Sequence, residues 1–162
     1  MLCEKILGTL SEPQYKGKLV DYVDIDWHET YNKLLRKNSR AGRDVAIRLG
    51  DEVLKTGMKP GDILGIDEDG TLIAVDVLPA DVLIVTLTEP TPFNVAKAAY
   101  EIGNCHAPLF AGQEEFQFVT IFNEPMEHLL HHLHGVKVER KTEKLDFSKQ
   151  ISSIVGHGHH HH

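Results

Sequence analysis

The first half of the chain is patterned as short β-strands. Val23, Ile25 and Trp27 alternate with aspartates, which predicts a strand with one face in water. Further strands are expected at 45–49, 63–66 and 72–77. Asp69-Gly70 lies between the last two and is a strong hairpin signal. Since no helix of three turns is evident before residue 90, the pattern predicts a β-rich amino-terminal domain over residues 1–78.

The pattern changes at Pro79. Residues 81–87 are nearly all β-branched or leucine, as is typical of a covered strand, and an Ala-rich helix is expected from Pro92 through Ile102, with Gly103 in the C′ position. The remaining expected elements are strands at 106–110 and 115–120, a helix from the cap Asn123 to His134, and a strand at 136–140. This βαββαβ order predicts a ferredoxin-like domain over residues 79–141 and an α+β fold for the whole chain.

The last part of the chain is polar. It ends in Gly156-His157-Gly158 and four consecutive histidines. Because such a segment has little to bury, residues 142–162 are expected to form a flexible tail.

Composition and charge narrow the function. The net charge is −7, which argues against a nucleic-acid surface, because phosphate binding needs clustered Lys and Arg. No apolar run approaches a membrane span, and Glu4 and Lys5 interrupt the apolar start that a signal peptide would need. Cys3 and Cys105 are far apart, which excludes a disulfide scaffold and fits a reducing compartment. A cytoplasmic protein without nucleic-acid or membrane partners is expected.

Histidine is the unusual component, with 11 residues in the chain. The carboxyl-terminal histidines are His157, His159, His160, His161 and His162. Consecutive imidazoles bind Ni²⁺, Cu²⁺ or Zn²⁺ with little geometric demand, but an expression tag is the alternative explanation. Only four are consecutive, and the Gly-His-Gly spacing before them also counts against a tag. If native, this segment collects metal, because it lacks the fixed surroundings of a catalytic ion.

A second group of histidines lies on the last helix. The buried stripe expected there is Met126, Leu129, Leu130 and Leu133. His128, His131 and His132 then fall on the wet face, and His128 and His132 are one turn apart, so both rings can reach one ion. The alternative is a polar face that happens to be rich in histidine. A zinc-protease helix is excluded because Leu129 stands where HExxH needs its glutamate.

His106 stands alone, in Gly103-Asn104-Cys105-His106. A lone histidine is more often structural than a metal ligand. It would hold an ion if a symmetry-related copy supplied a second ring, since a two-fold axis gives each residue a twin. Cys105 beside it is either a soft ligand or an inert small hydrophobe.

The segment 96–109, AKAAYEIGNCHAPL, carries a resemblance to a known family, with weaker support at 42–49 and 61–64. The chain resembles the urease accessory metallochaperones usually called UreE, over nearly its whole length. The resemblance implies an amino-terminal domain similar to a chaperone peptide-binding module and a ferredoxin-like metal-binding domain. It further implies a homodimer in which His106 of both subunits holds one Ni²⁺, a histidine-bearing tail, and two partners, the urease accessory GTPase and the apo-urease complex.

The sequence departs from the family pattern in two places. The family commonly has Arg before the histidine, where this chain has Cys105, so a positive charge is removed and two thiols are brought near a dimer axis. A second histidine pair of the family is replaced here by Val119 and Thr120, and no site is expected there.

These observations favour a nickel metallochaperone, not an enzyme, that delivers Ni²⁺ to apo-urease through the GTPase. His106 would be the primary ligand and the tail histidines would recruit metal to it. Zn²⁺ and Cu²⁺ are expected to bind as well, because nitrogen ligands do not select Ni²⁺ over them. The alternatives are a metal buffer, a peptide-binding co-chaperone for residues 1–80, and a zinc hydrolase, for which an activating carboxylate is missing.

Overall fold

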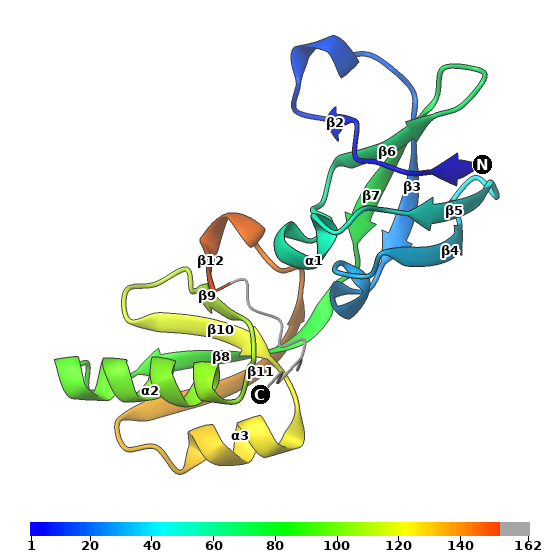
Figure 1. Ribbon diagram of the computed structural model, residues 1–162. Helices are drawn as coiled ribbons and strands as arrows, with labels where there is room; N and C mark the ends of the chain where they lie inside the picture. Colours follow the sequence, from blue (N-terminus) through cyan, green and yellow to red (C-terminus); the bar gives the residue numbers. More distant parts are fainter. Residues whose placement is uncertain (153–162) are drawn as a thin grey trace. The chain divides into compact units, whose positions relative to one another are not determined.

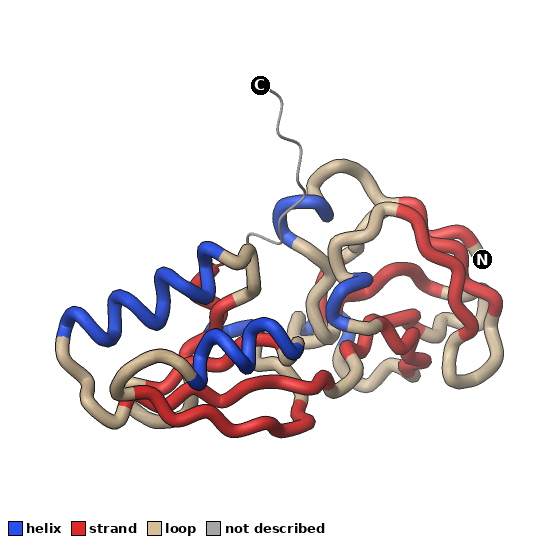
Figure 2. The backbone as a smooth tube through the Cα atoms, turned by 90° about the horizontal axis from the view of Figure 1, so that it is seen from below, coloured by secondary structure: helices blue, strands red, loops and turns tan. Residues whose placement is uncertain are grey.

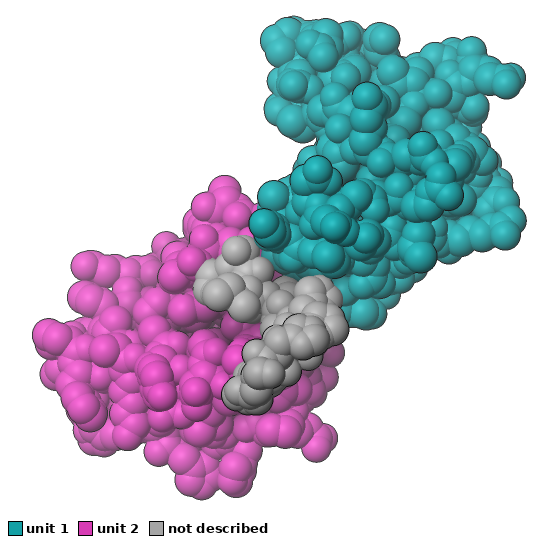
Figure 3. All heavy atoms as spheres, in the orientation of Figure 1, with its two compact units in different colours: residues 1–78 teal, residues 79–162 magenta. Residues whose placement is uncertain are grey.

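The computed structural model describes residues 1–152. The chain divides into two compact units, Met1–Leu78 and Pro79–His162 (Figure 3). Within the described residues, no helix is long and apolar enough to cross a membrane. The tail histidines at positions 157 and 159–162 lie outside the described residues.

Unit 1 consists of two small sheets and short helical turns (Figure 1). One sheet has the order β1-β5-β4, made of Leu2–Cys3, Asp44–Arg48 and Leu34–Asn38. The other has the order β2-β6-β7-β3, made of Gly8–Thr9, Asp62–Ile66, Leu72–Val77 and Val20–Ile25. The helical turns are η1 at Pro13–Tyr15, η2 at Trp27–Glu29 and α1 at Val53–Thr56. The predicted hairpin is confirmed, because β6 and β7 pair antiparallel.

The core of unit 1 follows the predicted alternation up to Ile25. Val23 and Ile25 are fully buried on β3. The strand ends at Ile25, so the expectation that Trp27 continues the alternation is wrong. Asp26 accepts a hydrogen bond from the backbone of Glu29 and the Glu29 carboxylate accepts one from the Asp26 N–H, and this capping box starts a helical turn at Trp27.

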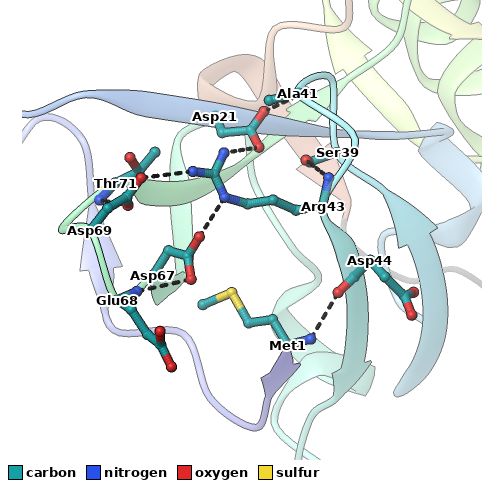
Figure 4. Close-up of polar contacts among 10 residues, drawn as sticks. All are labelled: Met1, Asp21, Ser39, Ala41, Arg43, Asp44, Asp67, Glu68, Asp69 and Thr71. Carbon is teal, nitrogen blue, oxygen red and sulfur yellow. Dashed lines mark hydrogen bonds and ion pairs between the residues drawn. The ribbon is translucent and has the colours of Figure 1, made fainter.

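Arg43 ties together three segments of unit 1 (Figure 4). Its guanidinium donates to Asp21 at 2.8 Å, to Asp67 at 2.6 Å and to Asp69 at 3.1 Å. Asp21 is only 6% exposed and also accepts from the backbone N–H of Ala41. Burial alone would raise the pKa of Asp21, but the hydrogen bonds from Ser39, Arg43 and Ala41 outweigh it and hold the pKa below its usual value.

Unit 2 has the predicted element order, β8–α2–β9–β10–α3–β11, and one further strand. Its strands are β8 at Ala80–Leu87, β9 at Leu109–Ala111, β10 at Gln117–Ile121, β11 at Val136–Glu143 and β12 at Gln150–Ser152. Its helices are α2 at Pro92–Asn104, α3 at Glu124–His131 and the turn η3 at Phe147–Lys149. The sheet order is β11-β8-β10-β9-β12, and every neighbouring pair is antiparallel.

Both helices cover the same face of this sheet (Figure 2). The shared core consists of Leu83, Val85, Ile102, Leu109, Met126 and Leu130. Leu83 and Val85 are two residues apart on β8 and therefore point to one face, where Ile102 of α2 and Leu130 of α3 meet them. Both helices are thus fixed to the sheet through residues in their last turns.

Two predicted helix ends are wrong. α2 continues through Gly103 and ends at Asn104. The left-handed residue that ends the helix is His106, and not Gly103 as expected. α3 ends at His131 and not at His134. His132 caps it, and the chain turns through Gly135, whose φ of 71° is the conformation that glycine adopts most readily.

The expectation of a flexible tail from residue 142 is wrong for 142–152. β11 continues to Glu143 along the edge of β8, and β12 pairs with β9. Leu145 is buried, and the ring of Phe147 packs edge-on against Phe110 at 5.9 Å between centroids. These few apolar side chains are enough to fix the segment, although its composition is mostly polar.

Candidate metal site

His106 occupies the left-handed position that ends α2. The helix begins with Thr91, whose hydroxyl accepts from the Asn94 N–H at 3.1 Å. At the other end, the N–H of His106 donates to the carbonyl of Gly103 at 2.9 Å, and the N–H of Ala107 donates to Ile102 at 3.4 Å. These two bonds form a Schellman motif, in which His106 is the C′ residue with φ 56°.

Glycine is the usual residue at C′, because a side chain there meets the backbone in the left-handed conformation. The cost for another L-residue is about 1 kcal/mol, although histidine tolerates the region better than most. Strain of this kind is kept where the side chain has another use. The backbone geometry therefore marks His106 as a candidate functional residue on grounds that its sequence motif did not include.

The turn that carries His106 is anchored on both sides. Ile102 is fully buried in the core before it. After it, the buried hydroxyl of Thr120 donates to the carbonyl of Pro108 at 2.7 Å. Cys105 and His106 between these anchors are exposed. In the sequence, Thr120 is notable only because it stands where the family has a histidine. In the structure it positions the turn.

The side chains at the turn are available to a ligand. Cys105 is a free, exposed thiol, whereas Cys3 is buried, and burial raises the pKa of the Cys3 thiol. The imidazole of His106 forms no hydrogen bond or ion pair with residues 1–152. In that part of the chain, no group of three or more His, Cys, Asp or Glu side chains is close enough to hold a metal ion. Within residues 1–152, a single chain therefore offers His106 and Cys105 but no complete set of ligands.

The outer face of α2 leads directly to this turn. Phe93 is 71% exposed and Tyr100 is 66% exposed, and their spacing of seven residues places them on one helix face. Gly103 follows one turn after Tyr100, and a Cβ added there would meet nothing within 4 Å. We call Phe93, Tyr100 and Gly103 the α2 outer face. In the sequence, only the seven-residue spacing of the two aromatic residues indicates this face.

The histidines of α3 lie where the helical pattern predicts. Met126 and Leu130 are buried, and His128, His131 and His132 are exposed. The rings of His128 and His132 are close, with 4.3 Å between centroids. Beyond the end of α3, Nε2 of His134 lies 2.6 Å from a carboxylate oxygen of Glu89.

Comparison with known proteins assigns both units to one family. Residues 3–78 match the family model described as UreE urease accessory protein, N-terminal domain. Residues 80–162 match the model described as UreE urease accessory protein, C-terminal domain.

Individual relatives agree over nearly the full length. The urease accessory protein UreE of Helicobacter pylori (strain G27) is 38% identical over 157 residues, which cover 97% of this chain and 89% of that protein. The protein of the same name from Helicobacter acinonychis (strain Sheeba) is also 38% identical, with the same coverage. That of Actinobacillus pleuropneumoniae is 36% identical over 161 residues, covering 95% of this chain and 80% of the relative.

Proposed function

The chain belongs to the UreE family of urease accessory proteins, and on this basis we propose that it is a metallochaperone that delivers Ni²⁺ to apo-urease. In this proposal it binds and releases the ion without catalysing a reaction, and the urease accessory GTPase is the partner through which the ion is passed on. We assign unit 2, with its βαββαβ order and antiparallel sheet, to the ferredoxin-like class and regard it as the metal-binding domain.

The observation that carries the proposal is the left-handed conformation of His106. An exposed imidazole stands where glycine would end the helix at lower cost, on a turn that Ile102 and Thr120 hold in place. A metal ligand needs this combination of a free ring nitrogen and a fixed backbone.

A homodimer supplies the ligand that one chain lacks. The α2 outer face exposes two aromatic side chains, which are typical anchors of protein interfaces, and Gly103 gives room for the close approach of a second backbone. If two copies pack through this face with the end of each α2 at the two-fold axis, His106 meets its twin. Two imidazoles leave coordination positions open, so the ion can pass to an acceptor by ligand exchange.

The tail histidines start close enough to supply this site. β12 pairs with β9 so that Ser152 is opposite Leu109, three residues after His106. His157 follows Ser152 by five residues, which span at most about 18 Å at roughly 3.6 Å per residue. We propose that His157 and His159–His162 collect Ni²⁺ and pass it to His106. Zn²⁺ and Cu²⁺ are expected to compete, since imidazole does not select against them.

Cys105 adds a second donor type at the axis. Two thiols beside two imidazoles would favour softer ions such as Cu⁺ or Zn²⁺ over Ni²⁺. We propose Cys105 as an auxiliary ligand, next to His106 but not equivalent to it.

Equilibrium dialysis against Ni²⁺ tests the primary site. In a full-length chain with the five tail histidines changed to serine, one tight ion per dimer is expected. Adding His106→Ala should weaken that step by about a hundredfold or more, because both rings of the shared pair are lost at once. His28→Ala, which removes an imidazole packed against Trp27 in unit 1, is the matched control and should change nothing. Tight binding that survives His106→Ala would refute the assignment.

A metal buffer is the alternative from another class. It would bind Ni²⁺ equally well but would have no specific acceptor. Transfer of Ni²⁺ from the loaded dimer to the apo-urease complex in the presence of an excess of a small chelator separates the two functions. The proposed chaperone transfers its ion under these conditions, whereas a buffer loses it to the chelator.

A further inference from the structure

We propose that His128 and His132 at the end of α3 form a second, exchangeable site for a divalent transition-metal ion, separate from His106. Both side chains are exposed, their ring centroids are 4.3 Å apart and the ring planes are tilted by 49°. Residues four apart on a helix lie one above the other, so two imidazoles at this separation can bind one ion between them.

A hydrogen bond sets one of the two rings in the form that binds metal. Nδ1 of His132 lies 2.7 Å from the carbonyl oxygen of His128. A carbonyl only accepts, so Nδ1 carries the proton and donates it, and in the neutral form of this ring it is Nε2 that has the lone pair. A bond of this kind to a backbone carbonyl is the usual support of a metal-binding histidine, because it fixes both the ring and the tautomer.

The helix that carries the pair is held at both ends. Asn123 caps its start by accepting from the Met126 N–H at 2.8 Å. Met126 and Leu130 are buried on the opposite face, so the last turn cannot rotate freely. His132 is the C-cap, where unpaired carbonyls give the helix a partial negative charge that favours a bound cation.

The composition of the site predicts weak, exchangeable binding. Among residues 1–152, no third His, Cys, Asp or Glu completes a cluster with the pair, so this part of the chain leaves the remaining positions to water. His134 is engaged by Glu89, and His131 has no ring contact with either partner of the pair. Imidazole nitrogens bind Cu²⁺ most tightly, with Ni²⁺ and Zn²⁺ following. Such a site suits the temporary holding of an ion.

The test uses a full-length background in which neither His106 nor the tail contributes. His106→Ala is combined with serine at positions 157 and 159–162, and binding of Ni²⁺ and of Cu²⁺ alone is measured by isothermal titration calorimetry. One ion per chain is expected, with Cu²⁺ bound more tightly than Ni²⁺. His128→Gln and His132→Gln should each weaken binding roughly tenfold or more. His131→Gln, which removes an exposed imidazole from the same helix, should leave it unchanged.

A second measurement reports on the rings directly. In metal-free protein, ¹⁵N chemical shifts should show that His132 is protonated at Nδ1 and not at Nε2. Substoichiometric Cu²⁺ should broaden the imidazole signals of His128 and His132 before those of His131.

Each outcome bears on this site alone. Equal losses in all three glutamine variants, or a loss with His131→Gln as large as with His128→Gln, would overturn the proposal in favour of unspecific binding by exposed histidines. Because the background lacks His106, these results are independent of whether the dimer-axis site exists.

Discussion

At the scale of the residue, His106 combines an unfavourable backbone conformation with an exposed, uncommitted side chain. The sequence motif drew attention to this histidine, but the pattern placed the end of the helix at Gly103. The reason for the difference is tertiary. Ile102 must reach the core and Pro108 must reach the hydroxyl of Thr120, and these two anchors shift the stop to His106. Contacts between distant segments cannot be obtained from local helix-stop signals.

Replacing His106 separates its two roles. His106→Gly should be more stable than His106→Ala by about 1 kcal/mol, because glycine adopts the left-handed conformation without steric cost. Urea unfolding at neutral pH measures the difference. Both variants should lose the tightest step of Ni²⁺ binding to the same extent. If alanine were as stable as glycine there, the left-handed turn would not be the conformation in solution.

At the scale of the element, most of unit 2 was predictable. The β-branched run of β8, the prolines before α2 and the cap at Asn123 are strong local signals, and the βαββαβ order follows from them. β12 was not predictable, because it has three residues and its neighbours are polar. Its position depends on the free edge of β9 and on the packing of Phe147 against Phe110, which appear only after the sheet has formed.

The contribution of the α2 outer face to the proposed dimer can be tested by mutation. Tyr100→Ser should leave the fold of the monomer intact, because the side chain is largely exposed and makes no core contact. In the proposed dimer, loss of this tyrosine from each subunit should raise the dissociation constant by at least about thirtyfold. Sedimentation velocity over a range of concentrations measures this, with Leu34→Ser, a similarly exposed residue of unit 1, as the control. An unchanged dimer would place the interface elsewhere.

At the scale of the whole molecule, both units have buried apolar cores, and unit 1 adds ion pairs between its segments. The most connected of these are the ion pairs of Arg43 with Asp21, Asp67 and Asp69 (Figure 4). A hydrogen bond from Arg43 lowers the pKa of Asp67, and one from the backbone of Thr71 lowers that of Asp69. In unit 2 the proposed metal sites add a source of stability that depends on Ni²⁺.

The pH dependence of unit 1 follows from these carboxylates. Because the pKa values of Asp21, Asp67 and Asp69 are lower in the folded state, the unfolded chain binds more protons, and stability falls as the pH drops below about 4. Arg43→Gln should lower the unfolding midpoint at pH 7 by several degrees and make the further loss at acid pH smaller. Fluorescence of Trp27, the single tryptophan, reports on unit 1 selectively. A variant with the acid sensitivity of the original chain would contradict this account.

The pairing of β12 with β9 has a kinetic consequence. Ser152 pairs opposite Leu109, so the proposed tail ligands and His106 are joined by a short stretch of chain. In the proposed mechanism, a metal ion bound to the tail would therefore meet His106 at an effective concentration in about the millimolar range. Loading from the tail is then a first-order process, with a rate independent of how many copies of the protein are present. The transfer step within each proposed dimer would thus be as fast in a cell that makes little of the protein as in one that makes much of it.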